Sequence, residues 1–320
     1  MKNRGIYCKL GQYIGSLDNI APARYVEVLK VLQDEGPSVW YNDIKIVIEN
    51  DFNCKLEDIY SEFDEKPIAA ATLAQVHKAK LKRNGEDVAV KVQFPTLFLQ
   101  TKYDMLVTEL SVKIIDNVAY LFDYKAINFR HLFENFRLSR QKELDFELEL
   151  DNGVKTKKNF EGDDRIYVPD YDQVYCCKRV LTMEFIDNSL KINNADAITQ
   201  KYGKNMTQEY VWKTLIDLFA KQIFVFGHIH VDGHPGNILI RAHPKHKGRP
   251  QLVLLDHGHY WTINDESRIK FCELWYAMVT FNKEKTKEMS YEFGMDNYYR
   301  YLPLIFTYRT IDSKYMWQLG

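Results

Sequence analysis

Apolar and polar residues alternate most clearly in the range Asp87–Phe94, which reads DVAVKVQF. Because successive side chains of a strand point to opposite faces, the valines fall on one face and Ala89 and Lys91 on the other. Asn84-Gly85 lies between this run and an earlier strand-like run, an arrangement typical of a hairpin with a type I′ turn. The pattern therefore predicts a hairpin that presents Lys91 on its less bulky face.

Apolar residues at helical spacing mark most of the remaining chain. In a predicted helix over residues 5–17, Lys9 and Gln12 share a face that the apolar residues leave free. The whole pattern predicts a helical extension ahead of a mixed sheet. The further predicted helices are Ala21–Leu32, Tyr41–Glu49, Leu56–Phe63, Thr101–Phe122, His131–Thr156 and a run from Thr207 onward, and the further predicted strands are Tyr167–Pro169 and Val174–Phe185.

Two short strand-like runs lie between His228 and Gly258, joined by the long basic turn Arg241–Gln251, and they predict a second hairpin. Asp232 and Asn237 precede the first run, and Asp256 ends the second. A hairpin brings these three residues to one end of a small sheet. Carboxylate and amide oxygens gathered there are a setting for a hard cation and a phosphate.

An acidic run, QKELDFELELDN, falls within the predicted helix His131–Thr156. In a continuous helix Asp145 and Glu149 share a face, and Glu143 lies about 120° around from Glu149. Acidic runs on helices are usually solvated, and a lysine such as Lys91 is more often a surface residue when it is considered alone. Taken together, however, the residues supply the ammonium, carboxylate and amide groups that phosphoryl transfer requires.

Composition limits the class of protein. A chain of 320 residues is long enough for about two domains, and its net charge of -1 argues against a nucleic-acid partner. The five cysteines include no CxxC pair, so we expect reduced thiols and a compartment that is not secretory. No run of about 18 apolar residues predicts a membrane span, and neither a signal peptide nor a mitochondrial presequence is recognisable.

The motifs, taken in order, resemble those of the UbiB or aarF-domain-containing (ADCK) atypical kinases, in particular a mitochondrial branch with a DHG motif. The resemblance implies an α+β fold, namely a two-lobed protein-kinase-like fold with an N-terminal helical extension that carries a KxGQ motif. It divides the chain into an extension (1–64), an N-lobe (65–186) and a helical C-lobe (187–320), which we expect to be shortened at its end. The matching residues are Lys9 to Gln12 (KxGQ), Ala69, Ala70 and Ala71 (alanine-rich loop), Lys91 (VAVK), Glu143 to Asp145 (ExD), Met183 to Ile186 (hinge), His230 to Asn237 (catalytic loop) and Asp256 to Gly258 (DHG).

The resemblance also implies a role for each residue. Lys91 would contact the α- and β-phosphates of ATP and pair with Glu149. Asn237 and Asp256 would bind Mg²⁺, and Asp232 would be the catalytic or water-positioning acid. The alanine-rich loop would cover the nucleotide and the hinge would contact it, while the KxGQ and ExD motifs would be regulatory. The residues concerned are Ala69, Ala70, Ala71, Glu184 and Ile186 for the nucleotide, and Lys9, Gln12, Glu143 and Asp145 for regulation.

By this resemblance the protein is an atypical kinase or ATPase that uses ATP and Mg²⁺ and acts in mitochondrial lipid or coenzyme Q homeostasis. The expected partners are a nucleotide, a lipid or membrane surface, and a mitochondrial protein assembly. Two features depart from the family pattern: Gly233 stands where a proline usually follows the catalytic Asp, and the turn Arg241–Gln251 is long. In this interpretation His230 is a structural brace, and His228 and His234 shape the loop.

Two other functions fit parts of the sequence. HIHVDGH resembles the HxHxDH pattern of dinuclear zinc hydrolases, with Asp256, His257 and His259 as further ligands. The extra Gly233 disrupts the spacing of that pattern, and the segment before it is a predicted amphipathic helix rather than a strand. The second alternative is a catalytically silent kinase-like scaffold, a subunit of a larger mitochondrial assembly.

Overall fold

The computed structural model describes residues 24, 28, 38–70, 73–121, 134, 137, 142–246 and 248–312. The predicted helices over residues 5–17 and Ala21–Leu32, with Lys9 and Gln12, therefore lie outside the described residues, apart from single helical positions at 24 and 28. The chain divides into two compact units. Unit 1 comprises Met1–Val211 and Asp232–His259, and unit 2 comprises Trp212–Val231 and Tyr260–Gly320. These units do not test the predicted boundaries at residues 64 and 186, which stay predictions.

Unit 1 contains an antiparallel sheet in the order β1-β3-β4-β6, with β2 paired to β3. The strands are β1 (Tyr60–Phe63), β2 (Ala69–Ala70), β3 (Ala74–Leu81), β4 (Asp87–Gln93) and β6 (Val180–Glu184). The predicted hairpin is confirmed as β3–β4, but the predicted type I′ turn is wrong. Five residues join the strands, and of Asn84 and Gly85 only Gly85 has a positive φ, 72°. The Asn84 side chain instead accepts from the Glu86 amide at 3.2 Å, which stabilises a longer loop.

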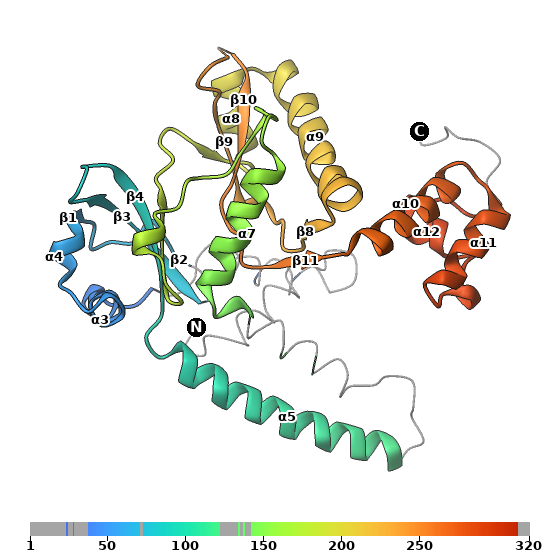
Figure 1. Ribbon diagram of the computed structural model, residues 1–320, viewed down its shortest axis with the longest axis horizontal. Coiled ribbons are helices and arrows are strands. Elements are labelled where there is room, and N and C mark those ends of the chain that lie inside the picture. The colour runs from blue at the N-terminus through green and yellow to red at the C-terminus, as the bar shows by residue number, and fades with distance from the viewer. Residues whose placement is uncertain are drawn as a thin grey trace. The chain divides into compact units, whose positions relative to one another are not determined.

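The two faces of this sheet are buried by different helices. Helix α3 (Tyr41–Phe52) confirms the helix predicted at Tyr41–Glu49 and packs its buried Ile44 and Ile48 against the valines of β4. Helix α7 (Phe146–Asn159) packs Phe146 against the other face. The alternation in β4 therefore has the predicted result, because the valines enter a core and Ala89 and Lys91 point toward the α7 side. Figure 1 shows α3 and α4 (Leu56–Ile59) beside this sheet.

The predicted second hairpin is confirmed as β9 (Ile238–Ala242) and β10 (Pro250–Leu254). Its strands lie at the centre of a sheet in the order β5-β10-β9-β7, where β5 is Ile166–Tyr167 and β7 is Leu190–Lys191. Leu254 pairs with Ile238, and the Leu255 amide donates to the Asn237 carbonyl at 3.0 Å. The residues that precede β9 and follow β10 therefore meet at one end of the hairpin.

Two predicted helices differ from the observed elements. Leu56–Phe63 is helical only to Ile59 and continues as strand β1, because Tyr60 pairs with Leu81 across the sheet. The predicted helix His131–Thr156 is interrupted at residues 144 and 145, and α7 begins at Phe146. The Asp145 side chain accepts from the Glu147 amide at 3.1 Å, so Asp145 is the N-cap of α7 rather than a residue within a continuous helix.

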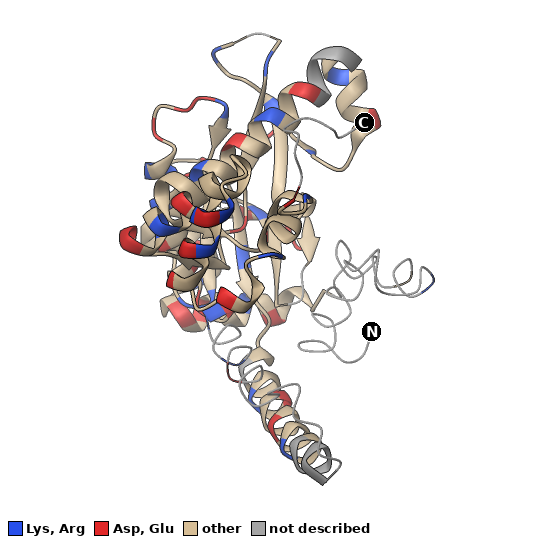
Figure 2. Ribbon diagram, turned by 90° about the vertical axis from the view of Figure 1, so that its right-hand side faces the viewer, with Lys and Arg blue, Asp and Glu red and all other residues tan. Residues whose placement is uncertain are grey.

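The remaining elements of unit 1 are helical. Helix α5 (Leu97–Leu121) corresponds to the predicted Thr101–Phe122. The short helix η1 (Gln173–Tyr175) overlaps the start of the predicted strand Val174–Phe185, and α8 (Ala195–Tyr202) was not predicted. Along the chain, acidic and basic residues are interspersed rather than segregated, as Figure 2 shows. Among the described residues, no helix combines the length and the apolar character needed to cross a membrane.

Unit 2 is mainly helical and has a small antiparallel sheet of β8 (His228–His230) and β11 (Tyr260–Thr262). Helix α9 (Lys204–Ala220) begins in unit 1 and leads into the π-helical turn η2 (Lys221–Phe226). Gly227 follows with a φ of 58°, and a Cβ there would lie 2.8 Å from the Ile263 carbonyl oxygen, so this turn requires glycine. The unit's core lies among α10 (Asp265–Val279), α11 (Lys283–Glu292) and α12 (Leu302–Thr307), which Figure 1 shows together.

Candidate functional site

Lys91 lies on strand β4 with its ammonium group between two carboxylates. Its Nζ donates to both oxygens of Glu149, at 2.7 and 2.8 Å, and to Oδ2 of Asp256 at 3.3 Å. The ring of Phe146 lies 5.1 Å from the same nitrogen. The Lys91 side chain is 13% exposed and that of Glu149 only 3%, so the pair is largely withdrawn from water. A lysine in this setting is not an ordinary solvated surface lysine.

The start of helix α7 explains where Glu149 points. Asp145 caps the helix, Phe146 anchors its first residue in the core, and Glu149 follows about one turn later on the face toward Lys91. The sequence-based expectation that Asp145 and Glu149 share a helical face is wrong, because Asp145 precedes the helix. Glu143 lies before the same break, and its Oε1 is 3.4 Å from Nδ1 of His259.

Burial and charge act in opposite directions on the Lys91–Glu149 pair. Burial raises the pKa of Glu149, the Lys91 ammonium lowers it, and nearby Asp256 raises it again, so that the value stands at about 7. Burial lowers the pKa of Lys91, but Asp256 and Glu149 more than offset this effect and hold it above its ordinary value. The Lys91 ammonium therefore stays charged, whereas the pKa of Glu149 lies near neutral pH.

The DHG loop places Asp256 at the end of the β9–β10 hairpin. Oδ1 of Asp256 accepts from the Gly258 amide at 2.9 Å, which leaves Oδ2 directed toward Lys91. A Cβ on Gly258 would lie 3.2 Å from Oδ1 of Asp256 and 3.4 Å from Oε2 of Glu149, so a larger residue there would require the Asp256 side chain to shift by a few tenths of an ångström. His257 is fully buried, with Nε2 3.3 Å from the Leu254 carbonyl oxygen.

Asn152 holds the same loop from α7. Its Nδ2 donates to the His257 carbonyl at 3.0 Å. Because Asn152 follows Glu149 by three residues, both side chains lie on one face of α7. Glu149 accepts hydrogen bonds from Lys91, and Asn152 donates one to the backbone of the DHG loop. Sequence reasoning missed Asn152. Its spacing of three residues from Glu149 was the available signal, but an asparagine at this spacing on a helix is also common where it makes no such contact.

Asn237 and Asp232 belong to the loop before β9. Nδ2 of Asn237 donates to the Asp232 carbonyl at 3.2 Å, and the His234 amide donates to the same carbonyl at 2.8 Å. Asn237 is thereby fixed next to the hairpin end that carries Asp256. Carboxylate and amide oxygens are ligands that Mg²⁺ accepts, and the Asp256 side chain is 40% exposed, so a hydrated ion can reach it.

The other residues predicted to contact the nucleotide lie in β2 and at the end of β6, and their contacts within the protein do not indicate a ligand. Ala69 and Ala70 form β2, and Ala71 lies outside the described residues. The Glu184 carboxylate accepts from the Tyr167 hydroxyl at 2.5 Å and lies 3.8 Å from Arg241, and its predicted hinge contact with the nucleotide stays a prediction. Ile186 is buried, and its carbonyl accepts from the Ser189 hydroxyl at 3.1 Å.

The histidines of HIHVDGH make structural contacts. Within unit 2, the His228 ring stacks on Tyr260 with centroids 4.4 Å apart, and the buried His230 lies 4.9 Å from the same ring. Nδ1 of His234 accepts from the Gly236 amide at 3.1 Å. Across the described residues, the histidine and carboxylate atoms that converge as they would on a metal belong to a different group, which includes none of these histidines. This arrangement does not support the zinc-hydrolase alternative.

A strand lysine paired with a helix glutamate, beside an aspartate that follows a hairpin, defines a protein-kinase-like arrangement. The chain belongs to the ABC1 atypical kinase-like domain family, whose model matches residues 31–290. This membership confirms the predicted family and the predicted kinase-like α+β fold.

The chain is similar to several named relatives. It is 36% identical over 298 residues to the probable serine/threonine-protein kinase abkD of Dictyostelium discoideum, covering 93% of this chain and 41% of that one. It is 33% identical over 311 residues to AarF domain-containing protein kinase 1 of Mus musculus, covering 97% and 57%. The chain thus spans about half the length of the curated relatives it matches.

A solved structure has a similar fold. The chain superimposes on the complex of Rv3197 with erythromycin from Mycobacterium tuberculosis with a TM-score of 0.60, at 20% identity, covering 87% of this chain and 65% of that one. At this level of identity the likeness concerns the fold alone.

Proposed function

We propose that the protein binds Mg-ATP at Lys91, Glu149 and Asp256 and transfers or hydrolyses the terminal phosphoryl group. The observation that carries the proposal is the pair of short hydrogen bonds from Lys91 to Glu149, 2.7 and 2.8 Å, which fixes an ammonium in a largely buried position. A fixed cation of this kind neutralises phosphate oxygens, and phosphoryl transfer depends mainly on such positioning and charge neutralisation. Membership of a family whose relatives are named kinases supports the same chemistry.

Each residue has a defined task in this proposal. Lys91 contacts the α- and β-phosphates, and Glu149 keeps its ammonium in place. Mg²⁺ would be held by Asn237 and Asp256, and it would neutralise the charge that develops on the phosphate oxygens. Asp256 would be available for this role because its contact with Lys91, at 3.3 Å, is longer than the contacts between Lys91 and Glu149. Asp232, on the loop that also fixes Asn237, orients the attacking hydroxyl or water.

The cellular part of the proposal rests on the family resemblance. We propose that the protein acts in mitochondrial lipid or coenzyme Q homeostasis, on a small molecule, a lipid or water rather than on protein side chains, in contact with a membrane surface or a mitochondrial assembly. The KxGQ residues Lys9 and Gln12, together with Glu143 and Asp145, regulate access to the nucleotide. Fractionation of cells that express the tagged protein tests the location directly, and recovery outside mitochondria would overturn it.

Phosphate release tests the chemistry. Purified wild-type protein with Mg-ATP is compared with Asp232→Asn, which keeps the shape of the side chain but cannot act as a base. We expect release by the wild type and a decrease of about 10² or more in the variant. Glu62→Gln, an exposed position on strand β1, serves as the matched control and should behave as wild type. If the wild type binds nucleotide but releases no phosphate under any condition, the protein is the kinase-like scaffold of the alternative interpretation.

A further inference from the structure

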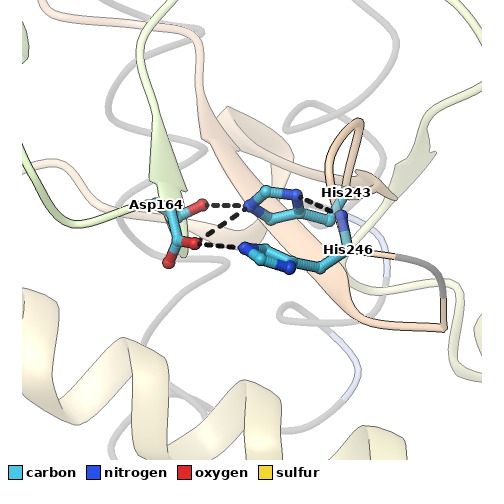
Figure 3. Close-up of side chains that lie close together, drawn as sticks. All are labelled: Asp164, His243 and His246. Carbon is cyan, nitrogen blue, oxygen red and sulfur yellow. Dashed lines mark hydrogen bonds and ion pairs between the residues drawn. The ribbon is translucent and has the colours of Figure 1, made fainter.

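Two groups of polar residues, each with a buried histidine, lie outside the residues assigned to the nucleotide. In the first, shown in Figure 3, atoms of Asp164, His243 and His246 lie within 4.8 Å of one another, a spacing that suits a metal ion. Nδ1 of His243 accepts from the backbone amides of Lys245 and His246, both at 3.1 Å, so the ring proton is on Nε2. This Nε2 donates to the Asp164 carbonyl at 3.0 Å, whereas a metal would need it unprotonated. The group therefore fastens the β9–β10 hairpin to the loop before β5.

The second group lies on strand β3 and consists of Gln75 and His77, both fully buried. Alternate residues of a strand share a face, so these two lie on the same face as Ala79 and Leu81, which belong to the core that α3 covers. An amide and an imidazole buried in an apolar core must both be hydrogen-bonded. Their partners decide how the amide is oriented and which ring nitrogen carries a proton.

Val39 fixes the orientation of the Gln75 amide. Oε1 of Gln75 accepts from the Val39 backbone amide at 2.8 Å, and Nε2 donates to the Val39 carbonyl at 3.4 Å. Turning the amide by 180° would set its NH₂ group against the Val39 N–H and its oxygen against the carbonyl, so only one orientation fits. Through this side chain, residues 38–40, which precede α3, are tied to the sheet.

The same amide requires a neutral His77. Nδ1 of His77 lies 2.7 Å from the Asp64 carbonyl oxygen, which can only accept, so Nδ1 carries the ring proton. Nε2 of Gln75 donates to Nε2 of His77 at 2.9 Å, so that ring nitrogen is unprotonated. A second proton on His77 would face the Gln75 NH₂ group, and the amide cannot turn to accept it without losing Val39. Every member of the network is therefore satisfied only while the ring is neutral.

The surroundings of the ring also favour its neutral form. Phe63 from β1 lies 5.0 Å from the His77 ring between centroids, and Val90 from β4 pairs with His77 across the sheet. Burial lowers the pKa of His77 from its ordinary 6.5, which outweighs the opposite effects of the hydrogen bond to Asp64 and of its charge. Among the described residues, Asp64 supplies the one charge that acts on this ring. Protons therefore favour the broken network: it should be complete above pH 6.5 and weaken as the pH falls below that value.

We infer that Gln75 and His77 form a proton-sensitive anchor, which holds residues 38–40 against the sheet while His77 is neutral and releases them when His77 is protonated. Residues 38–40 join α3 to the part of the chain that carries Lys9 and Gln12, so their release changes how that part is attached to the sheet. The inference is independent of the nucleotide proposal, because none of the anchoring residues is assigned to the nucleotide.

The protonation state of His77 is tested by nitrogen-15 NMR of protein labelled at histidine. We expect a neutral ring with its proton on Nδ1 at pH 8, and the signal is assigned by its loss in His77→Gln. A proton on Nε2 at pH 8 would overturn the inference, because Nε2 of His77 could not then accept from Gln75.

Release is tested by hydrogen exchange of the peptide that spans residues 38–40, corrected for the intrinsic pH dependence of exchange. In the wild type we expect protection at pH 8 and a loss of about tenfold or more at pH 5, whereas peptides of α10 keep their protection. His77→Gln cannot take up a proton and should show no such loss. His246→Gln, which removes a half-exposed histidine elsewhere, is the matched control and should respond as wild type.

Gln75→Glu gives the sharpest outcome. Its side chain can still accept from Val39, but it has no amide hydrogen for Nε2 of His77, so an added proton between the two completes the network. Protection of residues 38–40 should then be greater at pH 5 than at pH 8, the reverse of the wild type. If circular dichroism shows that this variant is unfolded, Gln75→Met replaces it and should lose the protection at both pH values. An unchanged wild-type protection at pH 5, a full response in His77→Gln, or a response of wild-type sign in Gln75→Glu or Gln75→Met would each overturn the inference.

Discussion

The ammonium of Lys91 donates two hydrogen bonds to the carboxylate of Glu149, although 58 residues separate the two in the chain. The pair connects the central strand β4 to helix α7, and Asp256 reaches the same ammonium from the end of the β9–β10 hairpin. Helix α7 and the end of the β9–β10 hairpin are therefore both linked to strand β4 through the single ammonium group of Lys91.

The first prediction concerns the coupling within the pair. Lys91→Met removes the charge that compensates a buried carboxylate, so it should cost about 2–3 kcal/mol of unfolding free energy at pH 8. Lys91→Met/Glu149→Gln removes both charges and should cost less than the single variant. Urea unfolding of the wild type, both single variants and the double variant measures the coupling. Additive effects would show that the pair does not interact in the folded protein.

The second prediction concerns pH. The pKa of Glu149 is raised from 4.5 to about 7, so the folded state binds more protons than the unfolded state between these values. The unfolding free energy should therefore fall as pH rises through this window, by at most about 3 kcal/mol. Glu149→Gln cannot titrate and serves as the reference. The stability of the wild type relative to this variant should decrease from pH 5 to pH 8, and an increase would mean that Lys91 outweighs burial.

The third prediction concerns Asn152, which donates to the His257 carbonyl. Asn152→Asp places an acceptor against that carbonyl and should displace the DHG loop, whereas Asn152→Ala merely removes the bond. Both should weaken the apparent affinity for Mg²⁺ in the presence of ATP, by about tenfold for the Asp variant and less for Ala. Asp151→Asn, the exposed neighbour, is the control. Equal Mg²⁺ affinities for the wild type and the three variants would show that Asn152 does not help to position Asp256.

The fourth prediction concerns the packing of α7. A Cβ on Gly153 would lie 2.4 Å from the Tyr171 hydroxyl oxygen and 2.5 Å from a ring carbon. Gly153→Ala should therefore destabilise the protein by about 1–3 kcal/mol despite the higher helix propensity of alanine. Adding Tyr171→Ala makes room for the methyl group, so in that background the Gly153→Ala substitution should lose most of its cost. Denaturant unfolding of the wild type, both single variants and the double variant measures this. If Gly153→Ala is equally destabilising in the Tyr171→Ala background, the added methyl group does not clash with Tyr171.

Local patterns in the sequence predicted the parts of the fold that depend on local geometry. The alternation in β4 predicted the face that carries Lys91, and the two runs around Arg241–Gln251 predicted the hairpin that ends at Asp256. The break before α7 was missed because an acidic run has helical periodicity whether or not one of its members, here Asp145, is a cap. Strand β1 was predicted as helix because only pairing with β3, a tertiary contact, favours a strand there.

Sequence reasoning could not establish which of the polar residues meet. The partner of Lys91 followed from resemblance to a family, since nothing local distinguishes Glu149 from the neighbouring acids. The contact between Asn152 and the DHG backbone depends on how α7 lies against the hairpin, which no local pattern encodes. The same is true of His243, whose tautomer is set by two backbone amides and a distant carbonyl.

Binding of Mg-ATP by Lys91, Glu149 and Asp256 is tested by the thermal stability of the protein with Mg²⁺ and ATP. A ligand at 100 times its Kd stabilises the folded state by about 2.7 kcal/mol, which gives a measurable rise in Tm. We expect a rise in Tm for the wild type that grows with ATP concentration, and a much smaller rise for Asp256→Asn, which keeps the shape but loses the charge proposed to hold the metal. No rise in the wild type, or an equal rise in Asp256→Asn, would show that Asp256 does not bind Mg-ATP.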